Sequence, residues 1–437
     1  MILALQLLLS LSILIVLHEM GHFIPAKLFK IRVEKFYLFF DPWFSLVKKK
    51  IGDTVYGIGW LPLGGYVKIA GMVDESMDKE QMAKPAEPWE FRSKPAWQRL
   101  IIMVGGVTVN VILGILIYAM VLSYWGKVVL PLDRVQDGVH VDSLLQEFGF
   151  RDGEKIVSLN DSIPETWQYV NKMLLLDDVR EIKVVRDGHA MVLNLPEDFG
   201  QMLVDSGVKE PFAPRIPCII DSVITGNPAA LAGLLKGDQI VGVDSMRSNY
   251  FGDIRKKIIA SPNRSVALHV LRNGSEITLP VTVSDAGTIG FEPRSVTEFF
   301  AVDTIRVPGW RAIPAGCREA WSRVTDYAMS LKFLFSKAGV QQMGGFISIA
   351  KIFPNEWDWW AFWEKTAWIS LVLAFMNILP IPALDGGHVM FLIWEVITGK
   401  AVSQKILERA QLIGMMLLLG LIVWANGLDI FRIFKGG

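Results

Sequence analysis

Cysteine and histidine are scarce in this sequence, whose 437 residues include only two Cys and six His. Cys218 and Cys317 are too few for a disulfide framework or a cysteine-rich metal site, and the sequence leaves open whether they pair. An excess of charge of either sign is also missing, because 44 basic residues balance 44 acidic ones. That balance gives no electrostatic footprint for nucleic acid, so we expect no nucleic-acid partner.

Apolar residues, in contrast, make up 51% of the chain. The chain is too long for one ordinary domain and too hydrophobic for a typical soluble protein, so we expect a membrane protein with soluble modules. The first apolar run lacks the basic start and the small-residue cleavage site of a secretory signal peptide, which favours a retained span. Four spans are expected in all, at about residues 2–24, 100–125, 366–382 and 410–434.

Lysine and arginine residues near the ends of these spans predict the orientation. They follow the first span, precede the second and separate the last two, so these loops should face the cytoplasm. The amino terminus and the long segment 127–360 would then lie outside, with the tryptophans near residue 360 at the outer interface. A cleavable signal would invert this scheme.

The first span ends in ionisable side chains. Residues 18–22 read His-Glu-Met-Gly-His, and helical spacing places His18 and His22 one turn apart on the same face. Two imidazoles so placed can share a tetrahedral zinc ion, while Glu19 beside them can move a proton. The alternative is a set of polar residues at the mouth of an anchor helix, although ionisable groups at membrane depth are costly without a role.

A catalytic zinc ion needs a third protein ligand and an open position for water. The candidate is Asp385, which follows two prolines that break the third span and precedes a glycine pair expected to be flexible. Because both spans run inward, His18 and Asp385 should reach similar depth near the cytoplasmic side. Asp385 could instead be a turn residue. Asn377 could hold a substrate carbonyl or stabilise an oxyanion, and a contact between helices explains it equally well.

The outer segment contains a repeat, because residues 149–160 align with residues 233–244 at an offset of 84 residues. Each copy also has a helix candidate and a hairpin. This pattern resembles tandem PDZ domains, which add an extended peptide to a sheet edge and recognise a chain end. The two domains would span residues 132–210 and 214–295. A pair of β-rich modules with closed or unused grooves is the alternative.

Taken together, the motif at residues 18–22, the segment 377–387 and the two PDZ-like copies between them resemble the site-2 protease family of intramembrane zinc metalloproteases. The resemblance implies one Zn²⁺ per chain, with His18, His22 and Asp385 as ligands and Glu19 as the general base. It also implies transmembrane protein substrates that reach the site through the lipid bilayer.

Two further segments fit the resemblance. Residues 52–69 form an apolar stretch with a Pro-Leu-Gly-Gly turn, similar to the membrane-reentrant hairpin of the family. Gly64 and Gly65 in this turn are expected to help position a substrate, because an exposed strand could pair with an unwound segment. A plain cytoplasmic hairpin is the alternative. Residues 105–110 are similar to the family's small-residue stretch in the second span, where close helix packing is the simpler explanation.

The expected fold is therefore a polytopic α-helical membrane protein with about four spans, a membrane-associated β-hairpin and two extracytoplasmic PDZ-like β-rich domains. Residues 1–126 and 361–437 would form the membrane core, with an amphipathic helical connector at 296–360.

The resemblance implies cleavage of single-span membrane proteins, such as anti-sigma factors or signal-peptide remnants, after their outer domains have been removed. It also implies a bacterial inner membrane, with the PDZ-like domains in the periplasm. One rival is a membrane-anchored tandem PDZ scaffold with an inactive metal site, which would not need Asp385. Another is a metal transporter, for which repeated or inverted spans would be expected.

Overall fold

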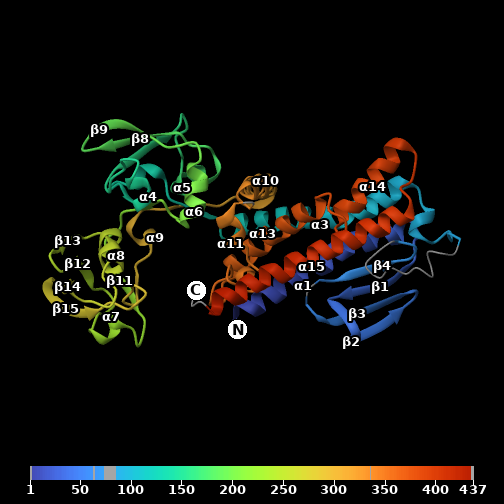
Figure 1. Ribbon diagram of the computed structural model, residues 1–437, viewed down its shortest axis with the longest axis horizontal. Coiled ribbons are helices and arrows are strands. Elements are labelled where there is room, and N and C mark those ends of the chain that lie inside the picture. The colour runs from blue at the N-terminus through green and yellow to red at the C-terminus, as the bar shows by residue number, and fades with distance from the viewer. Residues whose placement is uncertain (1, 63, 73–84, 335, 435–437) are drawn as a thin grey trace. The chain divides into compact units, whose positions relative to one another are not determined.

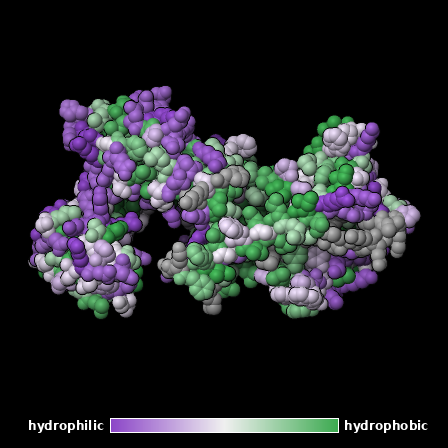
Figure 2. Space-filling model, in the orientation of Figure 1, coloured by the Kyte–Doolittle hydropathy of each residue, from purple (hydrophilic) through white to green (hydrophobic). Residues whose placement is uncertain are grey.

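The computed structural model describes residues 2–62, 64–72, 85–334 and 336–434. The chain divides into two compact units, one made of Met1–Lys127 with Arg306–Gly437 and the other of Val128–Ile305. The first unit is mainly helical and the second is rich in β-strands (Figure 1). Figure 2 shows hydrophobic side chains gathered over the helices of the first unit, whereas the visible face of the second is mostly hydrophilic.

Long helices dominate the first unit, and α3 contacts four of the others. The long helices are α1 (Ile2–Leu28), α3 (Ala96–Tyr124), α10 (Ala312–Ser330), α13 (Trp359–Ile378), α14 (Asp385–Thr398) and α15 (Gln404–Phe434). The short ones are η1 (Phe91–Ser93), η3 (Gly309–Arg311), η4 (Leu331–Phe333), α11 (Lys337–Gln342) and α12 (Phe346–Ala350). The partners of α3 are α1, α10, α13 and α14, so segments from both ends of the chain pack around it.

Within the described residues, three helices are long and apolar enough to cross a membrane, namely α1, α3 and α15. The segment predicted as the third span falls outside this set because Glu364 and Lys365 lie in the second turn of α13. The count of four spans therefore stays a prediction. The predicted break in this segment is confirmed, since α13 ends at Ile378 and the next helix begins at Asp385.

A four-stranded sheet replaces the hairpin predicted at residues 52–69. Its strands are β1 (Val33–Leu38), β2 (Phe40–Ile51), β3 (Thr54–Leu61) and β4 (Tyr66–Ile69), in the order β2-β3-β1-β4. The hairpin lies earlier, between β2 and β3, with its turn at Gly52 and Asp53.

The segment that carries Gly64 and Gly65 instead crosses from β3 to the far side of β1, and Leu63 lies outside the described residues. The hairpin prediction is wrong because β3 runs parallel to β1 while β4 is antiparallel to it, and a local turn signal does not reveal such pairings.

The second unit contains two modules, each with its own hydrophobic core. The first comprises β6 (Val139–Val141), α4 (Ser143–Gln146), β7 (Lys155–Leu159), α5 (Trp167–Leu176), β8 (Glu181–Arg186), β9 (His189–Asn194), α6 (Phe199–Ser206) and β10 (Phe212–Pro214). The second comprises β11 (Ile220–Val223), α7 (Pro228–Leu231), β12 (Gln239–Val243), β13 (Met246–Arg247), α8 (Phe251–Ile259), β14 (Ser265–Arg272), β15 (Ser275–Thr282) and β16 (Phe291–Pro293). Flanking elements are β5 (Lys127–Val129), η2 (Leu132–Arg134), α9 (Val296–Phe299) and β17 (Asp303–Ile305).

Apart from α6 and β13, corresponding elements follow one another in the same order in both modules. β6 pairs with β10 as β11 pairs with β16, and the sheet β7-β8-β9 corresponds to β12-β14-β15. The last residue of the first hairpin strand also makes the same kind of contact in both modules: Arg186 binds the buried Glu154, and Arg272 binds the buried Asp238. The aligned segments of the two copies therefore fold alike. Both cysteines of the chain are free thiols.

Candidate metal centre

Three potential ligand atoms lie together at the junction of α1 and α14. His18 and His22 come from consecutive turns of α1, and Asp385 is the first residue of α14. His18 Nε2, His22 Nε2 and Asp385 Oδ2 are each 3.3 Å from the other two. A tetrahedral zinc ion about 2.0–2.1 Å from each atom would hold them about 3.3 Å apart, so this set fits zinc without rearrangement.

The other nitrogen of each imidazole has its own partner, which fixes the orientation of the ring. His22 Nδ1 lies 2.8 Å from the backbone oxygen of Ile102 in α3. His18 Nδ1 lies 3.2 Å from the carboxamide of Asn110 in the same helix. A carbonyl partner, as at His22, orients the ring of a metal-binding histidine and selects the tautomer whose Nε2 is free to bind.

Asn110 is the residue of this site that the sequence analysis did not identify. Its side chain is almost fully buried, and its carboxamide oxygen has no hydrogen-bond partner among the described residues, because the amide nitrogen is the atom that faces His18. A half-turn of the amide would let that oxygen accept the Nδ1 proton of His18. The signal was a polar residue inside an apolar span, at the end of a stretch that we interpreted only as helix packing.

That packing is also present, and it brings α3 against the histidines. A Cβ atom on Gly105 would lie 2.0 Å from the backbone oxygen of Gly21, and one on Gly106 would lie 2.4 Å from His22 Nε2. Neither position has room for a larger residue. The glycines of α3 therefore allow the close approach that carries Ile102 and Asn110 to the two rings.

Asp385 is positioned by a tightly packed turn rather than by a flexible one, so the expectation for Gly386 and Gly387 is corrected. A Cβ on Gly386 would lie 2.2 Å from the backbone oxygen of Leu379, and one on Gly387 would lie 2.6 Å from that of Ile381. These glycines permit the first turn of α14 to fold back on the segment after α13. The carboxylate is held in place because its backbone has little freedom.

A cavity of about 560 Å³ opens in front of the three ligand atoms. Glu19 lines it beside the histidines, and so does His388, one turn after Asp385. The backbone amide of Val67 in β4 lies against the Glu19 carboxylate. A carboxylate in this position can accept a proton from a water molecule held at the ligand cluster.

The residues predicted to position substrate also lie near the cavity. The Asn377 carboxamide is 3.5 Å from His18 Nε2, close enough to share the region of the metal. Gly65 lines the cavity wall, and a Cβ there would lie 2.5 Å from Ile15 Cγ2. Gly64 packs against the ring of Phe40, 2.9 Å from where a Cβ would be. The crossover between β3 and β4 is thus pressed against α1 where that helix carries Glu19.

Two histidines one helical turn apart, a glutamate between them and a distant aspartate are typical of zinc-dependent metallopeptidases. Residues 6–421 match the model of peptidase family M50, which places the chain in that family, the site-2 proteases. It is therefore a membrane zinc metalloprotease of the site-2 type.

Several relatives of similar length carry names that agree with this assignment. The regulator of sigma-E protease RseP of Escherichia coli is 28% identical over 98% of this chain and 97% of its own. A protein of Ralstonia nicotianae named as a zinc metalloprotease is 27% identical over 97% of both chains. The regulator of sigma E protease of Haemophilus influenzae is 26% identical, again over 97% of both.

Proposed function

We propose that this protein is an intramembrane endopeptidase in which His18, His22 and Asp385 bind Zn²⁺ and Glu19 is the general base. The observation that carries the proposal is the 3.3 Å triangle of ligand atoms between helices from opposite ends of the chain. When bound, zinc supplies Lewis-acid chemistry that activates water at neutral pH. Glu19 accepts the proton of the attacking water and returns it to the leaving amine. Asn377 holds the oxygen of the scissile carbonyl.

The substrate would be a transmembrane segment that unwinds before it is cut, because a helix hides its backbone in internal hydrogen bonds. We place the unwound strand beside β4. This strand is an edge of its sheet, and its residues Tyr66, Val67 and Lys68 line the cavity that contains Glu19. Pairing with an open strand edge would replace the hydrogen bonds lost on unwinding. Gly64 and Gly65 position this edge.

The natural substrates would be single-span proteins whose outer domain has already been removed, such as anti-sigma factors or signal-peptide remnants. The names of the sigma-E regulators support this class. We assign the chain to a bacterial inner membrane, with the metal site toward the cytoplasm and the two β-rich modules in the periplasm. These modules would act as PDZ-like domains that read new chain ends or exclude untrimmed proteins.

The test compares metal content and cleavage of a purified single-span substrate for the full-length protein and its Glu19→Gln variant. The variant should keep its zinc, because Glu19 is not a ligand, and should cleave about 10²–10⁴-fold more slowly. His18→Ala should lose both zinc and activity. Glu408→Gln, which changes a half-buried glutamate of α15 that is not part of the ligand cluster, is the matched control and should cleave like the unmodified protein. Equal cleavage by the Glu19→Gln variant with zinc bound would sink the general-base assignment.

A further inference from the structure

The two β-rich modules differ at one pair of matching positions on their helices. The offset of 84 residues that aligns the two copies also aligns α5 with α8, since the buried Val170 then matches the buried Ile254. The next residue is Asn171 in the first module and Arg255 in the second. Because the modules fold alike, these two side chains start from the same place on the helix.

In the first module, Asn171 binds the backbone of β10. Its carboxamide nitrogen donates to the backbone oxygen of Phe212 over 2.7 Å, and its carboxamide oxygen accepts from the amide of Phe212 over 3.2 Å. These two backbone groups point away from β6, because the preceding Pro211 accepts from Asp142 on the β6 side. An extended peptide added to β10 would need the same two groups. Asn171 thus occupies the place of a peptide unit.

The second module has the same strand but lacks this contact. Its sequence Phe-Glu-Pro-Arg at residues 291–294 matches Phe-Ala-Pro-Arg at residues 212–215. Ile224 donates to the backbone oxygen of Gly290 on the β11 side, so the amide and the carbonyl of Phe291 point away from β11. Among the residues that the structure describes, neither group has a hydrogen-bond partner. The strand edge that is closed in the first module is therefore open in the second.

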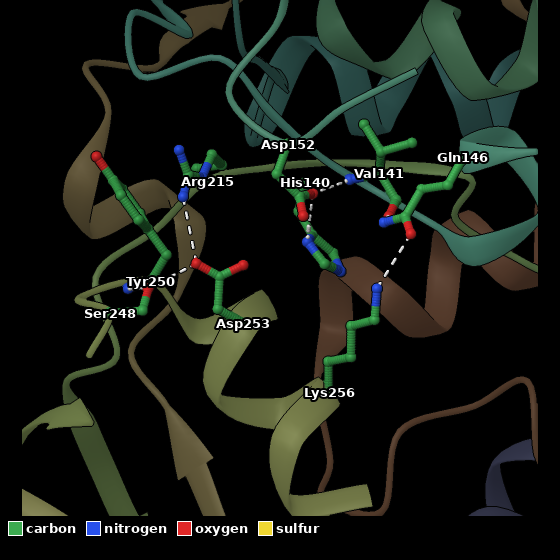
Figure 3. Close-up of polar contacts among 9 residues, drawn as sticks. All are labelled: His140, Val141, Gln146, Asp152, Arg215, Ser248, Tyr250, Asp253 and Lys256. Carbon is green, nitrogen blue, oxygen red and sulfur yellow. Dashed lines mark hydrogen bonds and ion pairs between the residues drawn. The ribbon is translucent and has the colours of Figure 1, made fainter. Parts of the chain in front are cut away.

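Arg255 takes no part in the junction of the two modules. Figure 3 shows that junction, where Asp253 of α8 accepts from Arg215 over 3.3 Å and Lys256 of α8 donates to Gln146 over 3.1 Å. Arg255 lies between these two residues in the sequence, yet it is exposed, and its guanidinium has no hydrogen bond or ion pair within the described part of the chain. Its positive charge is therefore available to a ligand.

The cavity beside Arg255 is mostly apolar. It has a volume of about 370 Å³ and is also lined by Phe251 one turn earlier on α8, by Val296 of α9 and by Trp167 of the first module. Glu210 lines it too, but no ion pair joins this carboxylate to Arg255 in the described ranges. A free guanidinium next to an apolar cavity and an open strand edge fits an extended chain that brings a carboxylate.

We propose that only the second module takes up a chain end, and that Asn171 closes the first module as a built-in substitute for one. The inference rests on the proposed role of the modules as readers of new chain ends, and it assigns that role to one of them. The chain end adds a short strand to β16 at Phe291, and its terminal carboxylate pairs with Arg255. The strand is short because Pro293 has no amide hydrogen to donate.

Hydrogen exchange at single amides of the full-length protein tests the difference between the two edges without any ligand. The amide of Phe212 should exchange at least about 10-fold more slowly than that of Phe291, because only the former is hydrogen-bonded. Asn171→Ala should remove this protection at Phe212. Asn194→Ala, which changes an exposed asparagine of β9, is the matched control and should leave it unchanged. Equal exchange at Phe212 and Phe291 in the unmodified protein would contradict the closure of the first module.

The same measurement locates the ligand when a pool of random hexapeptides with free carboxyl ends is added. Exchange at Phe291 should slow by about 10-fold or more, and an amide-capped pool should have no such effect. Arg255→Gln should abolish the response to the free ends. Arg264→Gln, which changes an exposed arginine ahead of β14, is the matched control and should respond like the unmodified protein.

The possible failures are distinguishable. A response at Phe212 with none at Phe291 would overturn the inference alone, because the first module would then be the reader. An equal response to the amide-capped pool would overturn the pairing of a chain end with Arg255. If neither amide responds to either pool, the modules do not read chain ends, and both the inference and the role on which it rests are wrong. Cleavage of a trimmed substrate reports on the metal centre separately.

Discussion

At the scale of single residues, the metal centre depends on the absence of side chains at two glycines of α3 as much as on the ligands themselves. The imidazole of His22 occupies the space that a side chain on Gly106 would need. The same holds between Gly21 and Gly105, where two backbones touch. Packing and ligand placement are therefore one property of this crossing, and a methyl group should disturb both.

We expect Gly106→Ala to lose most of its zinc and its cleavage activity, because the new Cβ would lie 2.4 Å from His22 Nε2. Displacing a ligand by even 1 Å can cost about 10²-fold in rate. Metal analysis and substrate cleavage measure the two effects. Gly420→Ala in α15 is the control, since nothing lies within 4 Å of its added Cβ. Normal zinc content in the Gly106 variant would show that the helices can separate without cost.

At the scale of elements, the first long hairpin strand of each β-rich module ends in an arginine that binds a buried carboxylate. In the second module Arg272 in β14 binds both oxygens of Asp238, just before β12, over 2.7 and 2.6 Å. Burial alone would raise the pKa of Asp238, but Arg272 and the amide of Leu235 hold it below its ordinary value. Such a carboxylate stabilises the fold above its unfolded pKa, and this contribution is lost as the pH falls through the folded pKa.

Asp238→Asn should therefore destabilise the second module by about 1–3 kcal/mol at neutral pH, because Arg272 loses its ionic partner. The difference from the unmodified protein should shrink as the pH falls below about 4, where the unfolded carboxyl takes up a proton first and the folded one follows at lower pH. Hydrogen exchange of the β12 and β14 amides would measure this difference in stability between the variant and the unmodified protein. Asp221→Asn, which breaks an exposed ion pair with Lys236, is the control. It should change the free energy of opening derived from exchange by less than about 1 kcal/mol. A pH-independent difference would contradict the ionic explanation.

Elements whose signals are local could be predicted from the sequence, and elements set by distant pairings could not. The prolines between Ile378 and Asp385 mark the end of α13 wherever that helix packs. The sheet of β1 to β4 has no comparable local signal, because its centre is a parallel pair of β1 and β3. A glycine-rich crossover therefore had the appearance of a hairpin turn.

The same limit applied within the metal centre. His18 and His22 could be paired by helical spacing. Asp385 could be proposed as a ligand because an ionisable side chain at membrane depth is costly unless it has a function. Asn110 could not be assigned, since its contact with His18 depends on how two helices cross. Sequence periodicity gives the face of a helix but not the residue opposite it.

At the scale of the whole molecule, the proposed filter predicts the behaviour of a shortened chain. Replacing residues 132–295 by a flexible linker should leave zinc content and cleavage of a pre-trimmed substrate unchanged, because the ligands lie outside this range. Cleavage of the full-length substrate should rise toward that of the trimmed one. The measurement is the ratio of the two rates. If the shortened chain keeps the original preference, the modules do not select substrates.

The metal ligands are separated by most of the chain, since His22 and Asp385 are 363 positions apart while their ligand atoms are 3.3 Å apart. During synthesis a growing chain would thus carry two ligands through nearly the whole of translation before the third emerges. Three ligands are needed for a catalytic zinc site. An unfinished protein would be harmless to its neighbours, and proteolysis would begin only when both membrane halves have been made and assembled.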